Sequence, residues 1–312
     1  MNTSPAISII MPAYKASATI AASVASVRAQ TLRNWELIIV DDGSPDDTAA
    51  VAKSLAARDS RIRVISRENS GPSIARNRAV DHAKADILAF LDADDFWAPE
   101  RCLGMLTELD ERPNTGVLFS RTRFIDAKTL KPGTFTPHYS RLSAAQIMAE
   151  NVVCSTSNIV CRREVFKQSG GFTAGLNYAE DQDWLLRIAL ESDWDIRGVD
   201  AEWFFYRSAE DSQSADLEAM RAGWIQMVGS ACIDYPEKAP RAVRKAYGPS
   251  HRQLARRALR MSRPNTALRY LTSALRHDPL LIIREPRRTI LTLVGALVSF
   301  IPSTTLKELI AK

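Results

Sequence analysis

Short apolar runs alternate with stretches of helical periodicity over the first ninety residues. The apolar runs predict buried strands near Ile7–Met11, Glu36–Val40, Ile62–Ser66 and Ile87–Leu91. The stretches between them predict helices near Thr19–Ala29, Asp47–Ala57 and Ser73–Ala83. This alternation is typical of right-handed βαβ units, so we expect an α/β fold with a mostly parallel Rossmann-like sheet flanked by helices.

The pattern is less regular after residue 97. It predicts strands near Val117–Phe124, Ser157–Cys161 and Glu202–Tyr206, and helices near Arg163–Ser169 and Asp181–Glu191. From about Glu237 the chain changes to helical segments with Arg on one face and Leu or Ala on the other. We therefore expect an α/β domain over residues 1–236 and a basic, helical C-terminal region over residues 237–312.

Two of the predicted strands run directly into carboxylates. These are Asp41 and Asp42 after the second strand, and Asp92, Asp94 and Asp95 after the fourth. Ligands of open parallel sheets bind beyond the carboxyl ends of the strands. Carboxylates so close together repel one another unless a positive group joins them, and a divalent cation that also binds phosphates is one candidate. Capping of the next helix is the alternative interpretation.

In order and spacing, several segments resemble the family 2 glycosyltransferases, which have the nucleotide-diphospho-sugar transferase (GT-A) fold. The segments are ISIIMPAYKASATI, WELIIVDDGSPDDT, GPSIARN, ILAFLDADDFW, GGF and AEDQDWLLRIA. The resemblance covers about Ala6 to Arg207 and departs from the family at Lys15, where Asn is common. It implies an inverting, metal-dependent glycosyltransferase. Such an enzyme moves a sugar from a nucleotide-diphospho-sugar, here expected to be UDP-linked, to a glycan or lipid-linked acceptor in surface polysaccharide synthesis.

The resemblance also assigns roles to individual residues. Contacts with the nucleotide-sugar donor are expected from Pro12, Ala13, Tyr14, Asp41 or Asp42, Arg76, Asp92, Ala93, Asp95 and Arg207. Asp94 would hold Mn²⁺ or Mg²⁺ between the two phosphates. The catalytic pair would be Glu180 and Asp181, with Asp181 deprotonating the acceptor hydroxyl. Residues 1–97 would form the nucleotide-binding half of the domain and residues 98–236 the acceptor half.

The cysteine content and the absence of several known motifs limit the classes of protein that the chain can belong to. The four cysteines are scattered without a CxxC pair, which argues against a zinc site or a disulfide scaffold and favours a reducing cytoplasm. The beginning of the chain lacks the pattern of a secretory signal. The absence of GxGxxG, GxxxxGK[ST] and GxSxG patterns disfavours Rossmann dehydrogenases, P-loop enzymes and α/β-hydrolases.

The C-terminal region differs in charge from the rest of the chain. Residues 238–312 contain 16 Lys and Arg against 3 acidic residues, whereas residues 1–237 contain 25 against 33. Arg284, Arg287 and Arg288 precede the apolar run Ile290–Ile301, which is too short to span a bilayer. We expect this region to contact an anionic membrane, on its cytoplasmic face; the alternative is a helix packed on its own domain. No nucleic-acid partner is expected.

Two other functions remain open from the residues. One is a non-catalytic nucleotide- or glycan-binding protein, which the presence of Asp94 and the Glu180–Asp181 pair disfavours. The other is a phosphoryl-transfer enzyme that uses an Asp-x-Asp pair after a strand. Such an enzyme needs a small hydroxyl residue next, but here Asp95, Phe96 and Trp97 follow.

Overall fold

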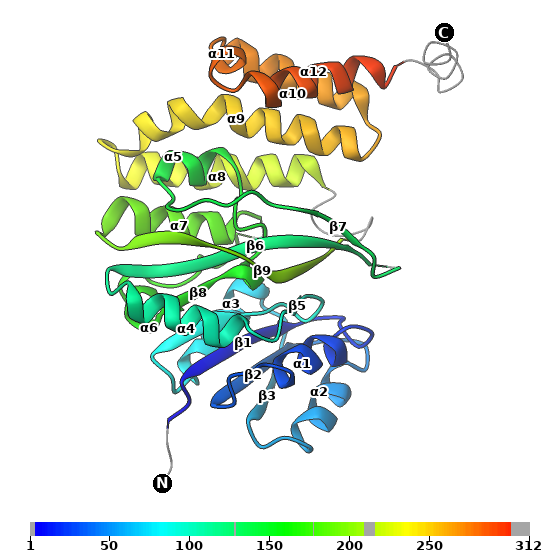
Figure 1. Cartoon of the computed structure of the whole chain (residues 1–312), viewed down its shortest axis with the longest axis vertical. Helices are drawn as coiled ribbons and strands as arrows, with labels where there is room; N and C mark the ends of the chain where they lie inside the picture. The colour runs from blue at the N-terminus through cyan, green and yellow to red at the C-terminus, as the bar shows by residue number, and fades with distance from the viewer. Residues whose placement is uncertain (1–3, 128, 177, 209–215, 301–312) are drawn as a thin grey trace. The chain divides into compact units, whose positions relative to one another are not determined.

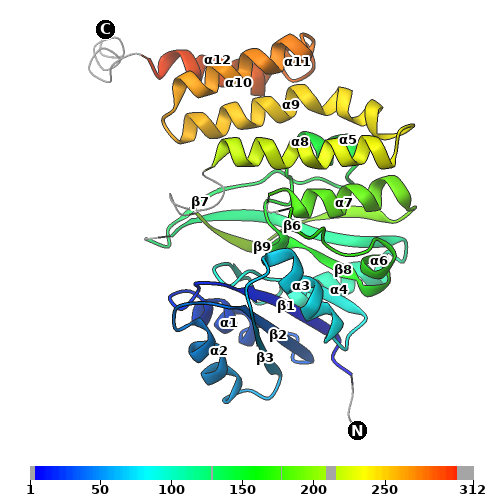
Figure 2. The ribbon, with the colours of Figure 1, turned by 180° about the vertical axis from the view of Figure 1, so that it is seen from behind.

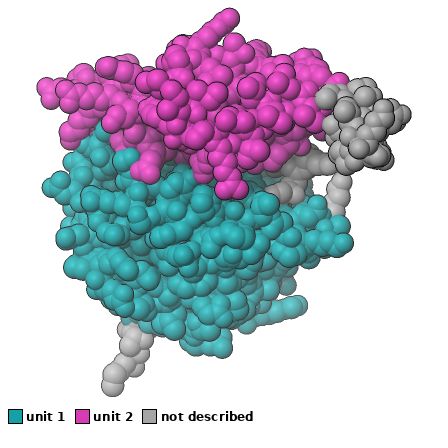
Figure 3. Space-filling model, turned by 45° about the horizontal axis from the view of Figure 1, so that its top comes forward, with its two compact units in different colours: residues 1–143, 151–210 teal, residues 144–150, 211–312 magenta. Residues whose placement is uncertain are grey.

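The computed structural model describes residues 4–127, 129–176, 178–208 and 216–300. It divides into two compact units, coloured separately in Figure 3: residues 1–143 with 151–210, and residues 144–150 with 211–312. The predicted division into a domain of residues 1–236 and a C-terminal region of residues 237–312 stays a prediction, since the two units do not show which part of the chain folds alone. Of the predicted membrane segment, Ile301 lies outside the described residues.

The first unit is built on one mixed sheet with the order β3-β2-β1-β4-β8-β6-β9-β5, and β7 pairs with β6 (Figure 1). The strands are β1 (Ile7–Ala13), β2 (Trp35–Asp42), β3 (Ile62–Arg67), β4 (Ile87–Phe90), β5 (Phe96–Trp97), β6 (Thr115–Asp126), β7 (Pro132–Phe135), β8 (Val160–Arg162) and β9 (Asp195–Ser208). Strands β1 to β4 are parallel, and β8 is antiparallel to both β4 and β6. The expected α/β sheet is confirmed, and its second half is mixed, since β6 and β9 are parallel whereas β5 and β8 pair antiparallel with their neighbours.

Helices cover both faces of this sheet. They are α1 (Ile20–Arg28), α2 (Thr48–Ala56), α3 (Pro72–Asp81), α4 (Arg101–Glu111), α6 (Arg163–Gln168) and α7 (Glu180–Glu191). Ala89 and Leu91 belong to the core shared with α1 and α4, whereas Phe90 between them packs against Phe172 and Trp184 on the other face. Successive residues of a strand point to opposite faces of the sheet. When helices cover both faces, every position is apolar, which explains the continuous apolar run before Asp92.

The segment before β8 differs from the expected strand at Ser157–Cys161. Residues Thr156–Asn158 form a short 3₁₀ helix, η1, and the strand begins only at Val160. The Ser155 hydroxyl accepts a hydrogen bond from the Ser157 N–H and so caps this turn. The Asn158 side chain replaces a strand partner, since it bonds both the N–H and the carbonyl of Ser120 in β6. Side-chain competition for backbone groups explains the difference.

The second unit is helical, as expected for the C-terminal region (Figure 2). Its helices are α5 (Ala144–Ala149), α8 (Leu217–Asp234), α9 (Ala239–Arg260), α10 (Pro264–His277), α11 (Leu281–Arg284) and α12 (Pro286–Val298). Its core includes Ala255 of α9, Leu271 of α10 and Ala296 of α12. In the part of the chain that the structure describes, no helix combines the length and the apolar character needed to cross a bilayer.

Candidate functional site

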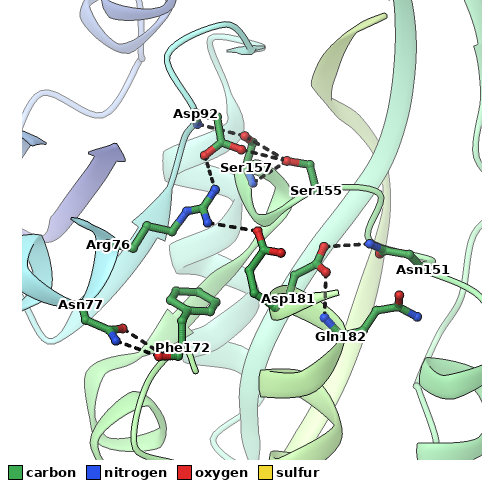
Figure 4. A network of polar contacts seen from close by, with 10 residues as sticks. Arg76, Asn77, Asp92, Asn151, Ser155, Ser157, Phe172, Asp181 and Gln182 are labelled. Atoms are coloured by element: carbon green, nitrogen blue, oxygen red, sulfur yellow. Dashed lines mark hydrogen bonds and ion pairs between the residues drawn. The ribbon is translucent and has the colours of Figure 1, made fainter. Parts of the chain in front are cut away.

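The end of β4 carries the first predicted ligand residue, Asp92, in a fixed position (Figure 4). Its Oδ1 accepts a hydrogen bond of 2.6 Å from Nη2 of Arg76, and its Oδ2 accepts one of 3.2 Å from the Ser155 hydroxyl. Its N–H donates to the Ser157 hydroxyl at 2.9 Å. The turn around η1 therefore holds both the backbone and the side chain of Asp92.

Asp94 and Asp95 lie in different surroundings, although they are neighbours in sequence. Asp95 is buried and accepts a hydrogen bond of 3.0 Å from the Arg207 N–H, and desolvation and the Asp94 charge hold its pKa well above the ordinary range. Asp94 is exposed, yet the protein atoms around it and the charge of Asp92 raise its pKa to about 6. The Arg207 Nε donates to the Asp94 carbonyl at 2.8 Å. Asp94 is thus the solvent-facing carboxylate of this cluster.

Arg76 joins this cluster to the acidic N-terminus of α7. It is buried on α3, and its Nη1 lies 3.2 Å from Oε1 of Glu180 while Nη2 binds Asp92. Desolvation acts to lower the pKa of Arg76, but the carboxylates of Asp92 and Glu180 outweigh it and raise the pKa. Burying this guanidinium is tolerable because both partners compensate its charge. One side chain therefore brings together two motifs that are far apart in sequence.

The Glu180–Asp181 pair stands at the beginning of α7. Desolvation and the neighbouring Asp181 charge raise the pKa of Glu180 to about 7, against the opposing effect of Arg76. Asp181 is buried and accepts hydrogen bonds from Asn151 Nδ2 at 2.8 Å and from the Gln182 N–H at 2.7 Å (Figure 4). Desolvation raises its pKa as well. Both groups are therefore stronger bases than an ordinary carboxylate.

The end of β2 holds the other predicted acidic pair. Asp42 is occupied by the protein, because it accepts from the N–H and hydroxyl of Ser70 and from the Gly71 N–H at 2.8 Å. These bonds fix the turn before α3, where Gly71 has a φ of 88°. Asp41 accepts a bond of 3.3 Å from the Ser44 N–H. Asp41 therefore keeps more acceptor capacity for a ligand than Asp42.

The end of β1 leads to the same edge of the sheet. Pro12 and Ala13 are buried, and Tyr14 is 47% exposed. Lys15 has a φ of 50° and donates its N–H to the Ser44 hydroxyl. Asn tolerates this left-handed conformation better than Lys. The conformation gives a physical reason for the Asn that the family commonly has here.

The donor set suits a cation only in part. Among the described residues, no group of three or more His, Cys, Asp or Glu side chains could hold a metal ion. Mg²⁺ is commonly held by one or two carboxylates with substrate phosphates completing the shell. Exposed Asp94 fits that arrangement, whereas Asp92 and Asp95 are engaged by Arg76 and by the Arg207 N–H.

Three residues around the site could not be assigned a role from the sequence. Asn151 positions Asp181, while Ser155 and Ser157 position Asp92. Ser155 and Ser157 belong to a short run of small polar residues at the beginning of the predicted strand Ser157–Cys161, and Asn151 has no such signal. Of the sequence-predicted residues, the structure joins Arg76, Asp92 and Glu180 directly, and links Asp94 and Asp95 to Arg207; the roles carried over by resemblance stay predictions.

Known proteins share both the sequence and the fold. The model of glycosyl transferase family 2 matches residues 8–170. The UDP-Glc:alpha-D-GlcNAc-diphosphoundecaprenol beta-1,3-glucosyltransferase WfgD of Escherichia coli is 29% identical over 222 residues, which are 70% of this chain and 83% of that protein. The putative teichuronic acid biosynthesis glycosyltransferase TuaG of Bacillus subtilis is 31% identical over 72% of this chain and 94% of its own length.

A solved structure extends the similarity beyond the matched segment. The mannosyltransferase PcManGT of Pyrobaculum calidifontis, in complex with GDP-Man and Mn²⁺, has a TM-score of 0.64 at 18% identity. The comparison covers 95% of this chain and 87% of that one, and supports the GT-A fold. The sequence motifs at this edge of the sheet agree with the matching family model and with the fold of the solved structure. The chain therefore belongs to glycosyl transferase family 2 and is a glycosyltransferase.

Proposed function

We propose that this enzyme transfers a sugar from a UDP-linked donor to a glycan or lipid-linked acceptor in surface polysaccharide synthesis, with inversion at the anomeric carbon. The observation that carries the proposal is the Arg76 bridge. It holds Asp92, on the expected donor side, beside Glu180, on the expected acceptor side, although Arg76 and Glu180 are 104 residues apart in sequence. A donor and an acceptor hydroxyl bound at these two places would lie close together.

On the donor side, Asp94 would hold Mn²⁺ or Mg²⁺ together with the diphosphate. When bound, the ion would neutralise charge that develops on the leaving group. Asp41 would accept hydrogen bonds from the base or ribose, and Arg207 adds positive charge beside Asp94. The name of the WfgD relative specifies a UDP-Glc donor, and the PcManGT structure contains Mn²⁺. Both support a metal-assisted nucleotide-sugar reaction here.

On the acceptor side, Asp181 would remove the proton from the attacking hydroxyl. Its carboxylate is fixed by Asn151 and the Gln182 N–H but retains lone pairs for a further bond. Glu180 is committed to Arg76, which favours Asp181 as the base. The WfgD relative is named for an acceptor on diphosphoundecaprenol, which supports a lipid-linked acceptor. Such an acceptor would bring the enzyme to a membrane surface.

Replacing the proposed base separates binding from chemistry. We expect Asp181→Asn to bind UDP and Mn²⁺ with unchanged affinity, because the size of the side chain is kept. Its transfer rate should fall by about 10²–10⁴-fold, the usual contribution of a general base. Calorimetry would measure binding, and product formation on a lipid-linked acceptor would measure transfer. Nuclear magnetic resonance of the product would report the anomeric configuration.

The matched control is Asp183→Asn on the same helix. The Asp183 carboxylate binds the Thr173 hydroxyl and Arg187, so its loss should affect stability more than the transfer rate. If Asp181→Asn keeps more than about a tenth of the wild-type rate, Asp181 is not the base. Retention of configuration in the product would contradict the inverting mechanism.

A further inference from the structure

Helix α12 of the second unit has two faces of opposite character. Thr289, Thr292 and Ala296 are buried, and a Cβ added to Gly295 would come within 3.2 Å of Leu259 in α9. The other face is exposed and apolar, with exposed fractions of 46% at Ile290, 62% at Leu291, 48% at Val294 and 53% at Leu297. The helix therefore packs on its own unit with one face and presents the other to solvent.

Further exposed apolar side chains occur in and beside helix α11, which precedes α12. Positions 290, 291, 294 and 297 follow helical spacing and lie on one side of α12. Leu280, Ile282 and Ile283 are exposed just before it, Ile283 to 71%. We name these seven residues the α11–α12 apolar face; α11 and α12 lie side by side with α10 in both ribbon views (Figures 1 and 2). Exposed apolar surfaces of this kind usually mark an interaction site.

Basic residues accompany the α11–α12 apolar face. Arg284 and Arg287 are exposed at the N-terminal end of α12. Arg260 and Arg263 are also exposed and follow Leu259 of α9, the residue nearest to a Cβ added at Gly295. Between residues 238 and 300 the acidic residues are Asp278 and Glu285, and both form ion pairs with arginines. The surface thus combines apolar side chains with a positive fringe.

We propose that the α11–α12 apolar face docks on an anionic lipid bilayer, with α12 lying in the plane of the interface. Its apolar side chains would enter the boundary of the acyl chains while the arginines meet lipid phosphates. A second copy of the chain fits less well, because a symmetric contact would bring the same arginine clusters toward each other. The proposal does not depend on the identity of the donor or the acceptor.

The structure decides which variants can test this proposal. Removing α11 and α12 would uncover Arg252, which binds both Thr289 and Glu285, so a truncated chain is unsuitable. The double substitution Leu291→Ser with Val294→Ser changes exposed side chains only. Ile233→Ser is the matched control, since Ile233 is 79% exposed on α8 and lies outside the α11–α12 apolar face. Arg287→Gln tests the positive fringe.

The experiment is flotation of the full chain with vesicles of phosphatidylcholine alone or mixed with phosphatidylglycerol. We expect recovery of the wild type and the control with the anionic vesicles, and less recovery at high salt. The double variant should bind at least about tenfold more weakly, and Arg287→Gln about fivefold more weakly. Melting temperatures equal to the wild type would show that the variants are folded.

Three results would overturn the proposal. They are absence of wild-type flotation with anionic vesicles, equal flotation of the wild type and the double variant, and equal recovery with both kinds of vesicle. Size-exclusion chromatography identifies the alternative occupant, because a dimer that the double substitution dissociates would assign the face to a second copy. Donor hydrolysis by the double variant should equal that of the wild type, which keeps this test separate from the test of the proposed reaction.

Discussion

The ends of β2 and β4 have the same sequence pattern but use their carboxylates differently. Asp42 is engaged by backbone and side-chain donors of Ser70 and Gly71, which belong to the turn before α3. At β4, the carboxylate of Asp92 is engaged by a side chain, Arg76, that also binds Glu180. Asp42 thus fixes a turn, whereas Asp92 is one of two carboxylates that Arg76 joins.

Each strand end nevertheless leaves one carboxylate less engaged than its neighbours. Asp41 accepts a long hydrogen bond from Ser44, and Asp94 faces solvent. Because donors from the protein and from a ligand compete for the same oxygen lone pairs, the less engaged carboxylate is the better candidate for binding. A pair of acidic residues at a strand end is therefore better understood as one anchor and one ligand group than as two equivalent ligands.

The largest expected effect that tests this comparison is at Asp94. Asp94→Asn should weaken the Mn²⁺-dependent affinity for UDP by about 100-fold, since it removes the charge that faces the ion. Calorimetry with Mn²⁺ and with EDTA measures the difference. Wild-type affinity should itself fall when EDTA is present. Equal affinity of the wild type in both conditions would contradict the metal role of Asp94.

The two residues at the end of β2 should respond in opposite ways. Asp42→Asn should lower the free energy of unfolding by about 2 kcal/mol, because it places an amide against N–H and O–H donors. Asp41→Asn should leave stability nearly unchanged and weaken UDP binding by about tenfold. Denaturant unfolding and calorimetry on both variants measure the two quantities. If Asp42→Asn weakens UDP binding more than Asp41→Asn does, the assignment of anchor and ligand is wrong.

The smallest expected effect concerns the pH dependence of transfer. Desolvation and the Asp181 charge raise the pKa of Glu180 to about 7, so the pair takes up a proton as the pH falls through this value. Protonation of Glu180 removes a negative charge beside Asp181 and so makes Asp181 a weaker base, and the rate should therefore decline below about pH 7. Glu180→Gln removes the neighbouring charge and should move this decline to lower pH. A pH–rate profile of the variant that coincides with that of the wild type would contradict the coupling.

Much of the fold followed from local patterns. Apolar runs predicted the parallel strands, because a strand that is covered on both faces of the sheet is buried along its whole length, as β1 is. Strands β5 and β7 were not predicted, since they are short or lack an apolar run. The 3₁₀ turn at Thr156–Asn158 was also missed, because the side chains of Ser155 and Asn158 determine it through contacts with backbone groups.

The sequence by itself determined the family, the order of the strands and helices along the chain, and which acidic residues lie at strand ends. These features depend on the spacing of residue types along the chain, which is visible without contacts. Only the tertiary structure decided that Arg76 joins Asp92 to Glu180, that Asp42 is occupied while Asp94 is exposed, and that α12 has one buried and one exposed face. The physical reason is that the availability of a side chain depends on its partners in space. Those partners come from segments that can be more than a hundred residues away in sequence.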